Sequence, residues 1–380
     1  MLPLRAMTQR PSFRLRQLPT RGAVALAVVM ACVLPPRAWA DDSRLQAEGG
    51  LEFDSNVTLA TANAEPVGAL VLRGAALSAN RFVHGRHSFG IDAAARLRAA
   101  LDPTLASEMV GLGSLDLRWL YEPKARSVGV GIRSSLTDAR GLAGVLGART
   151  FRNANAEGLV TLRAGDHRFV MALGGRDFIY RPNAAQRYRG YAATAALLSP
   201  LWRSFDETRS LALAITLGFE GRGYSSRALA SQCPPALIAA TCVAETSVTR
   251  YDQVARAGLE LTYSGTTIIS AGYRVLDIAS NSFGQSLRRH QWSVAATHGL
   301  TARLFGTIGA TAQIDEFSPG ANLVGNPQNS EIATLADEAR SMVQMRLGYR
   351  LSARLTLEVR AASWTNLLSD VAYQRQAIGI

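Results

Sequence analysis

The sequence predicts an all-β fold, a single transmembrane antiparallel β-barrel of about sixteen strands, with short periplasmic turns and longer outer loops. Three observations predict this fold. Apolar and polar residues alternate with a period of two, which is typical of a strand with one apolar and one polar face. The alternating segments are about ten residues long, the length of a tilted strand that crosses a bilayer. The connections between the segments are short and long in turn.

The first alternating segment, residues 45–54, shows the pattern clearly. Leu51 and Phe53 fall on one side, and Glu52 and Asp54 fall on the other. The segment ends at Asp54-Ser55-Asn56, residue types whose side chains bond to nearby backbone groups in turns. We therefore expect a strand that ends at this triplet.

Fifteen further segments follow, so the expected strand number is even, as a closed antiparallel barrel in one chain normally requires. They are residues 67–82, 89–101, 111–121, 128–136, 154–164, 169–180, 187–198, 211–222, 251–263, 267–277, 289–298, 302–315, 340–350, 353–363 and 371–380. A secreted chain must bury so many apolar faces, and hydrocarbon can do so only where ring closure pairs every backbone group.

The connections divide into two sets. Those at 83–88, 122–127, 165–168, 264–266, 299–301 and 351–352 are short, and the one at 199–209 is somewhat longer. The others, at 54–66, 102–110, 137–153, 181–186, 224–250, 278–288, 316–338 and 365–370, are mostly longer and more polar. This segregation of loops by side is typical of an outer-membrane barrel.

The pattern of the N-terminus predicts an export signal. Residues 1–22 carry arginines and no acidic residue, an apolar run spans 23–34, and Ala38-Trp39-Ala40 resembles a cleavage site. We predict a signal peptide at residues 1–40 and a barrel at 41–380 in the outer membrane of a Gram-negative bacterium. A lipoprotein acceptor at Cys32 is the alternative for this segment.

The signal peptide also accounts for half of the net charge of +12, because it holds six arginines. Residues 41–380 then carry a net charge of +6, which removes most of the support for nucleic-acid binding.

Cys233 and Cys242 are nine residues apart, and in an oxidising compartment we expect them to form a disulfide. A metal site there would need a nearby histidine, and none stands near these cysteines.

Aromatic residues gather near predicted strand ends, where lipid–water boundaries favour such rings. Trp119, Tyr121, Tyr263 and Tyr349 fall at predicted periplasmic ends, and Phe178, Tyr180, Tyr251, Trp292 and Trp364 fall near outer ends.

The polar faces of the predicted strands define the candidate site, the lining of a pore. The residues expected to point inward are Asp92, Arg96, Arg98, Asp116, Arg118, Arg176, Glu220, Arg222, Asp252, Arg256, Glu260, Arg346, Arg354, Glu358 and Arg360. They could form cross-strand ion pairs that rigidify the wall. The excess of arginine would also favour anionic solutes or acidic sugars.

No motif predicts catalysis, and we expect neither an enzyme nor a cofactor or metal. His290 and His298 with Ser293 could suggest a barrel hydrolase. However, His290 and Ser293 have odd spacing in a predicted strand, so their side chains should point to opposite faces.

The segment Gly50-Leu51-Glu52-Phe53-Asp54-Ser55-Asn56-Val57 resembles the opening strand of barrels of the putative beta-barrel porin 2 type. The barrel of surface lipoprotein assembly modifiers opens similarly, but this chain has no room for the helical-repeat region of that family. The first resemblance implies an outer-membrane channel for exopolysaccharide export, with outer-membrane lipids, periplasmic export components and polysaccharide as partners. A passive porin for small, preferentially anionic solutes, a structural or adhesive surface barrel, and an outer-membrane hydrolase remain alternatives.

Overall fold

The structure is a computed structural model of the whole chain, and it describes residues 42–56, 65–123, 128–142, 150–233, 242–321, 341–365 and 374–380. The predicted signal peptide and the larger part of the predicted loop 316–338 lie outside these residues. In the described part of the chain, no helix is long and apolar enough to cross a membrane.

The described residues form sixteen strands and two short 3₁₀ helices. The strands are β1 (Asp42–Asp54), β2 (Ala69–His84), β3 (His87–Ala100), β4 (Val110–Tyr121), β5 (Val128–Gly141), β6 (Phe151–Ala164), β7 (His167–Tyr180), β8 (Tyr188–Arg203), β9 (Ser210–Ser231), β10 (Val243–Ser264), β11 (Thr267–Ser280), β12 (Leu287–Gly299), β13 (Leu304–Phe317), β14 (Ser341–Arg350), β15 (Thr356–Thr365) and β16 (Gln374–Gly379). The helices are η1 (Pro103–Glu108) and η2 (Ala184–Gln186).

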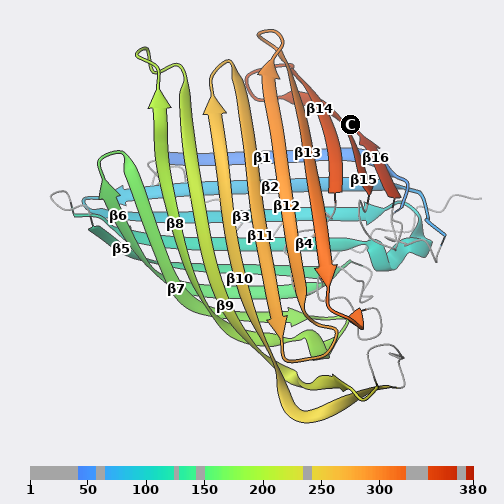
Figure 1. Cartoon of the computed structure of the whole chain (residues 1–380). Helices are drawn as coiled ribbons and strands as arrows, with labels where there is room; N and C mark the ends of the chain where they lie inside the picture. The colour runs from blue at the N-terminus through green and yellow to red at the C-terminus, as the bar shows by residue number, and fades with distance from the viewer. Residues whose placement is uncertain are drawn as a thin grey trace, which may run out of the picture.

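Each strand pairs antiparallel with its neighbours in sequence, and β1 pairs with β16, so the sheet closes into a barrel. In Figure 1 the strands near the N-terminus run across the back of the barrel, and those from β8 to β13 run steeply down its front. This crossing follows from the tilt of strands in a closed barrel. The predicted fold, including the number of strands, is confirmed.

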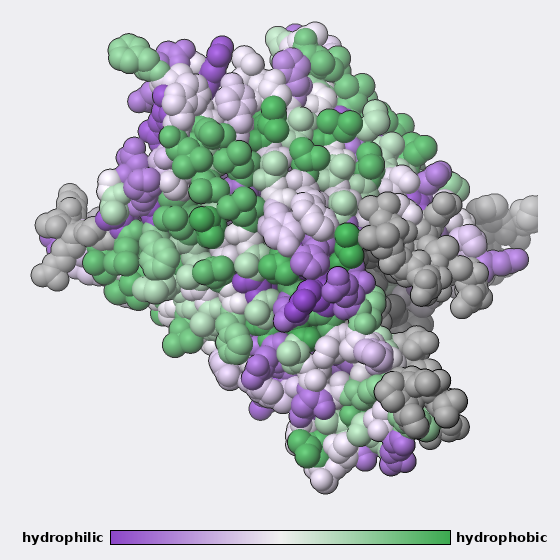
Figure 2. Space-filling view, viewed as in Figure 1, coloured by the Kyte–Doolittle hydropathy of each residue, from purple (hydrophilic) through white to green (hydrophobic). Residues whose placement is uncertain are grey.

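The pairing register assigns every paired residue to one of two faces, because residues directly opposite each other share a face. One face carries large apolar side chains that are exposed, such as Phe53, Leu70 and Leu173. The other carries Asp54 and Arg98, which are charged and yet buried. Charged groups become buried only inside the barrel, so this second face lines the lumen. Figure 2 shows apolar residues over much of the outer wall.

The β9–β10 hairpin differs from the prediction. The sequence predicts a loop at residues 224–250, but β9 and β10 are 22 residues each and continue through much of this range. Cys233 and Cys242 form the expected disulfide at the end of this hairpin, with their Cα atoms 5.4 Å apart. The pairing contains register shifts between Glu245 and Tyr251, so the polar residues there break the alternation that the sequence pattern requires.

Candidate functional site

The register places fourteen of the fifteen candidate pore residues in strands, on the lumenal face. Arg354 is the exception, because β15 begins at Thr356 and Arg354 lies in the turn that precedes it. Its backbone N–H donates to the Ser352 hydroxyl at 3.2 Å, a turn contact that a continuous strand would not make. The expected strand start at residue 353 is therefore wrong by three residues.

Most candidate residues toward the short-turn end of the lumen are exposed and only loosely paired, although Asp116, opposite Asp92, accepts from Arg133 at 2.8 Å. Arg118 lies 3.8 Å from Asp92, and their side chains are 45% and 43% exposed. Arg346 and Glu358 are 3.7 Å apart, as are Arg274 and Glu260. Exposed pairs at such distances contribute little to stability. This half of the lumen is therefore a polar, solvent-accessible vestibule.

Candidate residues toward the loop end are buried and tightly paired. Glu220 accepts from Arg222 at 2.9 Å, from Arg256 at 2.8 Å and from Arg176 at 3.1 Å. Glu220 and Arg222 are 1% and 0% exposed. Asp252 is also buried and pairs with Arg250 at 2.7 Å. These residues rigidify the wall here, because a buried charge needs partners of this kind.

An aromatic cluster lies beside these charges on the lumenal face. Phe178 stacks on Phe151 and on Tyr188, with ring centroids 6.1 and 5.1 Å apart, and Tyr224 lies 5.4 Å from Tyr188. The guanidinium of Arg222 lies 4.7 Å from the Tyr188 ring, a cation–π contact. All four rings are at most 4% exposed, so the cluster forms a packed apolar layer on the lumenal side of the wall at the loop end.

The cluster corrects part of the aromatic prediction. Phe178, Tyr180 and Trp364 face the lumen and are buried, so they do not anchor the barrel at a lipid–water boundary. Tyr251 and Trp292 lie on the outer face, as an anchoring role requires. Position at a strand end did not distinguish the two sets. The parity of each residue within its strand decides which face it occupies.

A second buried charge cluster joins β1, β2, β3, β15 and β16. Asp54 accepts from Arg98 at 2.8 Å and from both Nε and Nη2 of Arg375, at 3.0 and 2.8 Å. Glu52 pairs with Arg73 at 2.5 Å and with Arg360 at 2.7 Å. Asp54 also accepts from the N–H of Asn56 at 3.0 Å, which gives the Asp-Ser-Asn triplet the expected turn contact.

Sequence reasoning missed four members of this cluster as site residues: Glu52, Asp54, Arg73 and Arg375. Glu52 and Asp54 lie on the polar side of the first predicted strand, so a signal was present. The pattern places Asp54 on the polar side and at the end of this strand, but it indicates no ion pair for the Asp54 carboxylate. The pairing of β1 with β16 brings Asp54 and Arg375 together, and no local pattern reports a contact between the two ends of the chain.

Helix η1 packs over this cluster. Leu105 of η1 is buried against Ala69, Val71 and Ala100. Asp102 caps the helix by accepting from the N–H and the hydroxyl of Thr104, at 2.8 and 2.7 Å. The Thr104 hydroxyl and then its N–H hold the pKa of Asp102 below its usual range, because they stabilise the carboxylate.

The described residues contain no group of three or more His, Cys, Asp or Glu side chains that could hold a metal ion. The register places His290 on the outer face, where it contacts the Tyr273 hydroxyl at 2.7 Å, and Ser293 on the lumenal face. The two side chains therefore do not meet, which weakens the hydrolase alternative.

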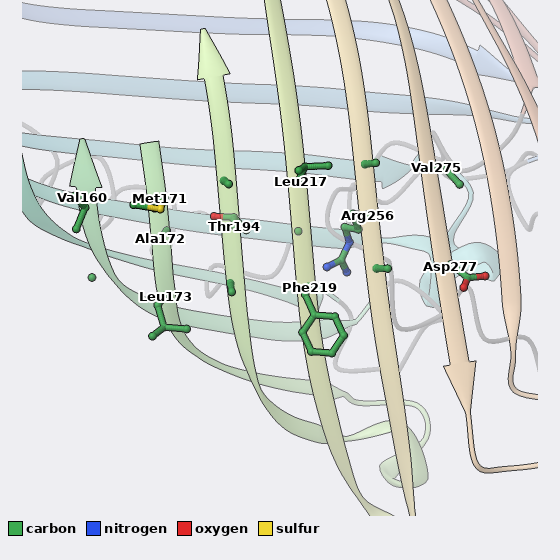
Figure 3. Close-up of a pocket in the computed structure, with 16 residues that line it drawn as sticks. Val160, Met171, Ala172, Leu173, Thr194, Leu217, Phe219, Arg256, Val275 and Asp277 are labelled. Carbon is green, nitrogen blue, oxygen red and sulfur yellow. The ribbon is translucent and has the colours of Figure 1, made fainter. Parts of the chain in front are cut away.

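A hollow of about 780 Å³ lies on the wall of β6–β11. Its lining comes mostly from the outer face, including Met171, Leu173, Leu217 and Phe219, which Figure 3 shows on β7 and β9, the strands on either side of β8. The hollow is therefore mainly an apolar depression of the outer wall, although the lumenal Arg256 is also among its lining residues.

A closed antiparallel barrel with an apolar outer face and a charged lumen defines the class, a membrane-spanning β-barrel of the outer-membrane type. No known protein family and no curated protein matches the sequence. Several solved structures resemble its fold.

They include Pseudomonas aeruginosa OccK1 (OpdK), at 10% identity and a TM-score of 0.40, covering 90% of this chain and 98% of that one. A BenF-like porin from Pseudomonas fluorescens Pf-5 shows 10% identity and a TM-score of 0.37, covering 90% and 99%. The Pseudomonas putida toluene transporter TodX shows 10% identity and a TM-score of 0.36, covering 93% and 91%. Likeness at this level carries no function over to this chain.

Proposed function

We propose that this protein is an outer-membrane channel through which small, preferentially anionic solutes diffuse passively. The observation that supports this proposal is the charge of the lumenal face, where arginines outnumber acidic residues among the paired residues of the described strands. Beyond the candidate pore residues, this face carries Arg44, Arg73, Arg81, Arg133, Arg163, Arg168, Arg274, Arg289, Arg350 and Arg375, against Asp42, Glu48, Glu52, Asp54, Glu157 and Asp315. A lumen of this sign raises the local concentration of anions.

Export of exopolysaccharide is the more specific alternative function, and it rests on the family resemblance of residues 50–57 alone. The buried side chains at the loop end of the lumen favour small solutes over a polymer, because a polymer needs a continuous open path. The pore-lining role of the candidate residues belongs to the same proposal.

Planar-bilayer recording of the refolded chain tests this function. We expect conductance without any partner protein, and a reversal potential in a salt gradient that shows preference for chloride over potassium. Charge reversal at Arg118 and Arg346, which are 45% and 44% exposed in the lumen, should shift the reversal potential toward cation preference. The matched control is Arg189→Glu, because Arg189 is 77% exposed on the outer face and should leave selectivity unchanged. A barrel that folds but conducts no current would contradict the proposal.

A further inference from the structure

Two arginines lie directly opposite each other on the lumenal face. The register pairs Arg73 of β2 with Arg98 of β3. Like charges in this position destabilise a strand pair unless negative charge lies close to them. Among the described residues, carboxylates lie close to both arginines, but the guanidinium groups around them are more numerous.

Four guanidinium groups share the acidic residues here. Glu52 forms ion pairs with Arg73 and Arg360. Asp54 forms ion pairs with Arg98 and Arg375. The third carboxylate, that of Glu108, lies 3.9 Å from Nη1 of Arg98, which is beyond hydrogen-bond distance. Among these described side chains, four positive charges therefore face three negative ones.

The pair also holds donors that no acceptor meets. Nε of Arg73, and both Nε and Nη1 of Arg98, are buried without a hydrogen-bond partner. Arg98 is only 2% exposed. Leaving a buried donor of a charged group unsatisfied is more unfavourable than leaving a neutral donor unsatisfied. Oε1 of Glu52 is also buried without a hydrogen bond of good geometry, but it lies 2.5 Å from Nη2 of Arg73. The unmet atoms of the arginine pair itself are N–H donors on cations, so an oxyanion is the ligand whose chemistry matches them.

The surroundings strengthen such an interaction. Val71 and Ala100 lie on the lumenal face of β2 and β3, and with Leu105 of η1 they form an apolar cluster beside the arginine pair. Charges interact more strongly in such low-dielectric surroundings than in water. A guanidinium also presents paired N–H groups in a planar fork that fits two oxygens of a carboxylate or phosphate.

We propose that Arg73 and Arg98 form an oxyanion-binding subsite in the lumen, which holds one carboxylate or phosphate group. This subsite rests on the proposed function, because it would lie on the route of an anionic solute. It goes beyond a general preference for anions, since binding depends on this pair and not on the total lumenal charge.

Thermal unfolding of the refolded barrel in detergent tests the subsite without requiring conductance. Inorganic phosphate, or acetate in a parallel arm, is compared with chloride at equal ionic strength, because a ligand that binds only the folded state raises its stability. We expect phosphate or acetate to raise the unfolding temperature of the wild-type chain, and the arm with the larger shift identifies the preferred oxyanion.

Arg73→Gln removes one of the two guanidinium groups of the subsite, while Glu52 keeps its ion pair with Arg360. In this variant, we expect the concentration of phosphate or acetate that gives half of the maximal rise in unfolding temperature to increase at least tenfold. Arg96→Gln is the matched control, because it removes an equal lumenal charge from an exposed position of β3 and should retain the wild-type dependence. If Arg73→Gln does not fold, Arg73→Lys keeps the charge and loses the fork, and it should still bind less tightly.

An equal phosphate effect in Arg73→Gln and wild type would overturn the subsite, as would no effect of either oxyanion on the wild type. The second result would mean that water alone satisfies these donors. Loss of conductance with the phosphate effect intact would instead contradict the proposed function and leave the subsite standing.

Discussion

Asp54 of β1 and Arg375 of β16 form a two-pronged ion pair, with Nε–Oδ1 at 3.0 Å and Nη2–Oδ2 at 2.8 Å, although they are 321 residues apart in sequence. Both side chains are at most 1% exposed. They join the first strand to the last, where the register contains only the three pairs from Glu52–Gly379 to Asp54–Ala377. This contact therefore contributes to closing the barrel where the ladder is shortest.

We predict that Asp54→Asn lowers the free energy of unfolding by about 3–5 kcal/mol, because it leaves the buried guanidiniums of Arg98 and Arg375 without their shared carboxylate. Urea unfolding of the refolded barrel, followed by tryptophan fluorescence, measures this change. Asp92→Asn is the control, since Asp92 is 43% exposed and 3.8 Å from Arg118, and we expect a change below about 1 kcal/mol. Equal effects of the two variants would contradict the role of Asp54.

The assignment of faces predicts opposite outcomes for two arginine substitutions at the middle of adjacent strands. Leu173 of β7 is 68% exposed on the outer face, so Leu173→Arg should destabilise the barrel in a lipid bilayer by about 2–4 kcal/mol. Thr194 of β8 is exposed on the lumenal face, so Thr194→Arg should be tolerated. Unfolding in lipid vesicles measures both, and a tolerated Leu173→Arg would mean that this wall does not face hydrocarbon.

Period-two alternation was sufficient to predict all sixteen strands because lipid and water impose opposite requirements on the two faces of each strand. It failed at the β9–β10 hairpin, which extends past both neighbouring strands: β8 reaches only Tyr224, and β11 reaches only Asp252. Beyond these pairs the two faces of the hairpin do not meet lipid on one side and the lumen on the other. The sequence therefore does not indicate which face Thr246 or Val248 occupies.

The same reasoning explains what the sequence left open at the site. Parity assigns Arg98 and Glu220 to the lumen, but it does not report their burial, which depends on partners brought by other strands. Arg98 meets Asp54 across β2, and Glu220 meets Arg176 across β8. Such contacts depend on register over several strands, and a single strand's pattern does not contain that information.

The disulfide predicts a local effect at the end of the β9–β10 hairpin. In the chain-entropy model, a bridge between residues nine apart stabilises the closed segment by about 2–3 kcal/mol. We expect the double variant Cys233→Ser/Cys242→Ser to fold as a barrel and to be cleaved by trypsin faster at Arg227 within the hairpin. Dithiothreitol should increase cleavage of the wild type and leave the double variant unchanged, and no response in either would contradict this role.

Phe178 and Trp292 test the corrected interpretation of the aromatic residues. Phe178 is fully buried on the lumenal face between Phe151 and Tyr188, so Phe178→Ala should lower the free energy of unfolding by about 3–5 kcal/mol. It should also raise single-channel conductance, because it removes a ring from the lumenal side of the wall. Trp292 lies on the outer face and is 43% exposed, so Trp292→Ala should leave conductance unchanged and should weaken its contacts with lipid and with the rings of Tyr273 and His290. Conductance that rises in Trp292→Ala and not in Phe178→Ala would reverse this assignment of faces.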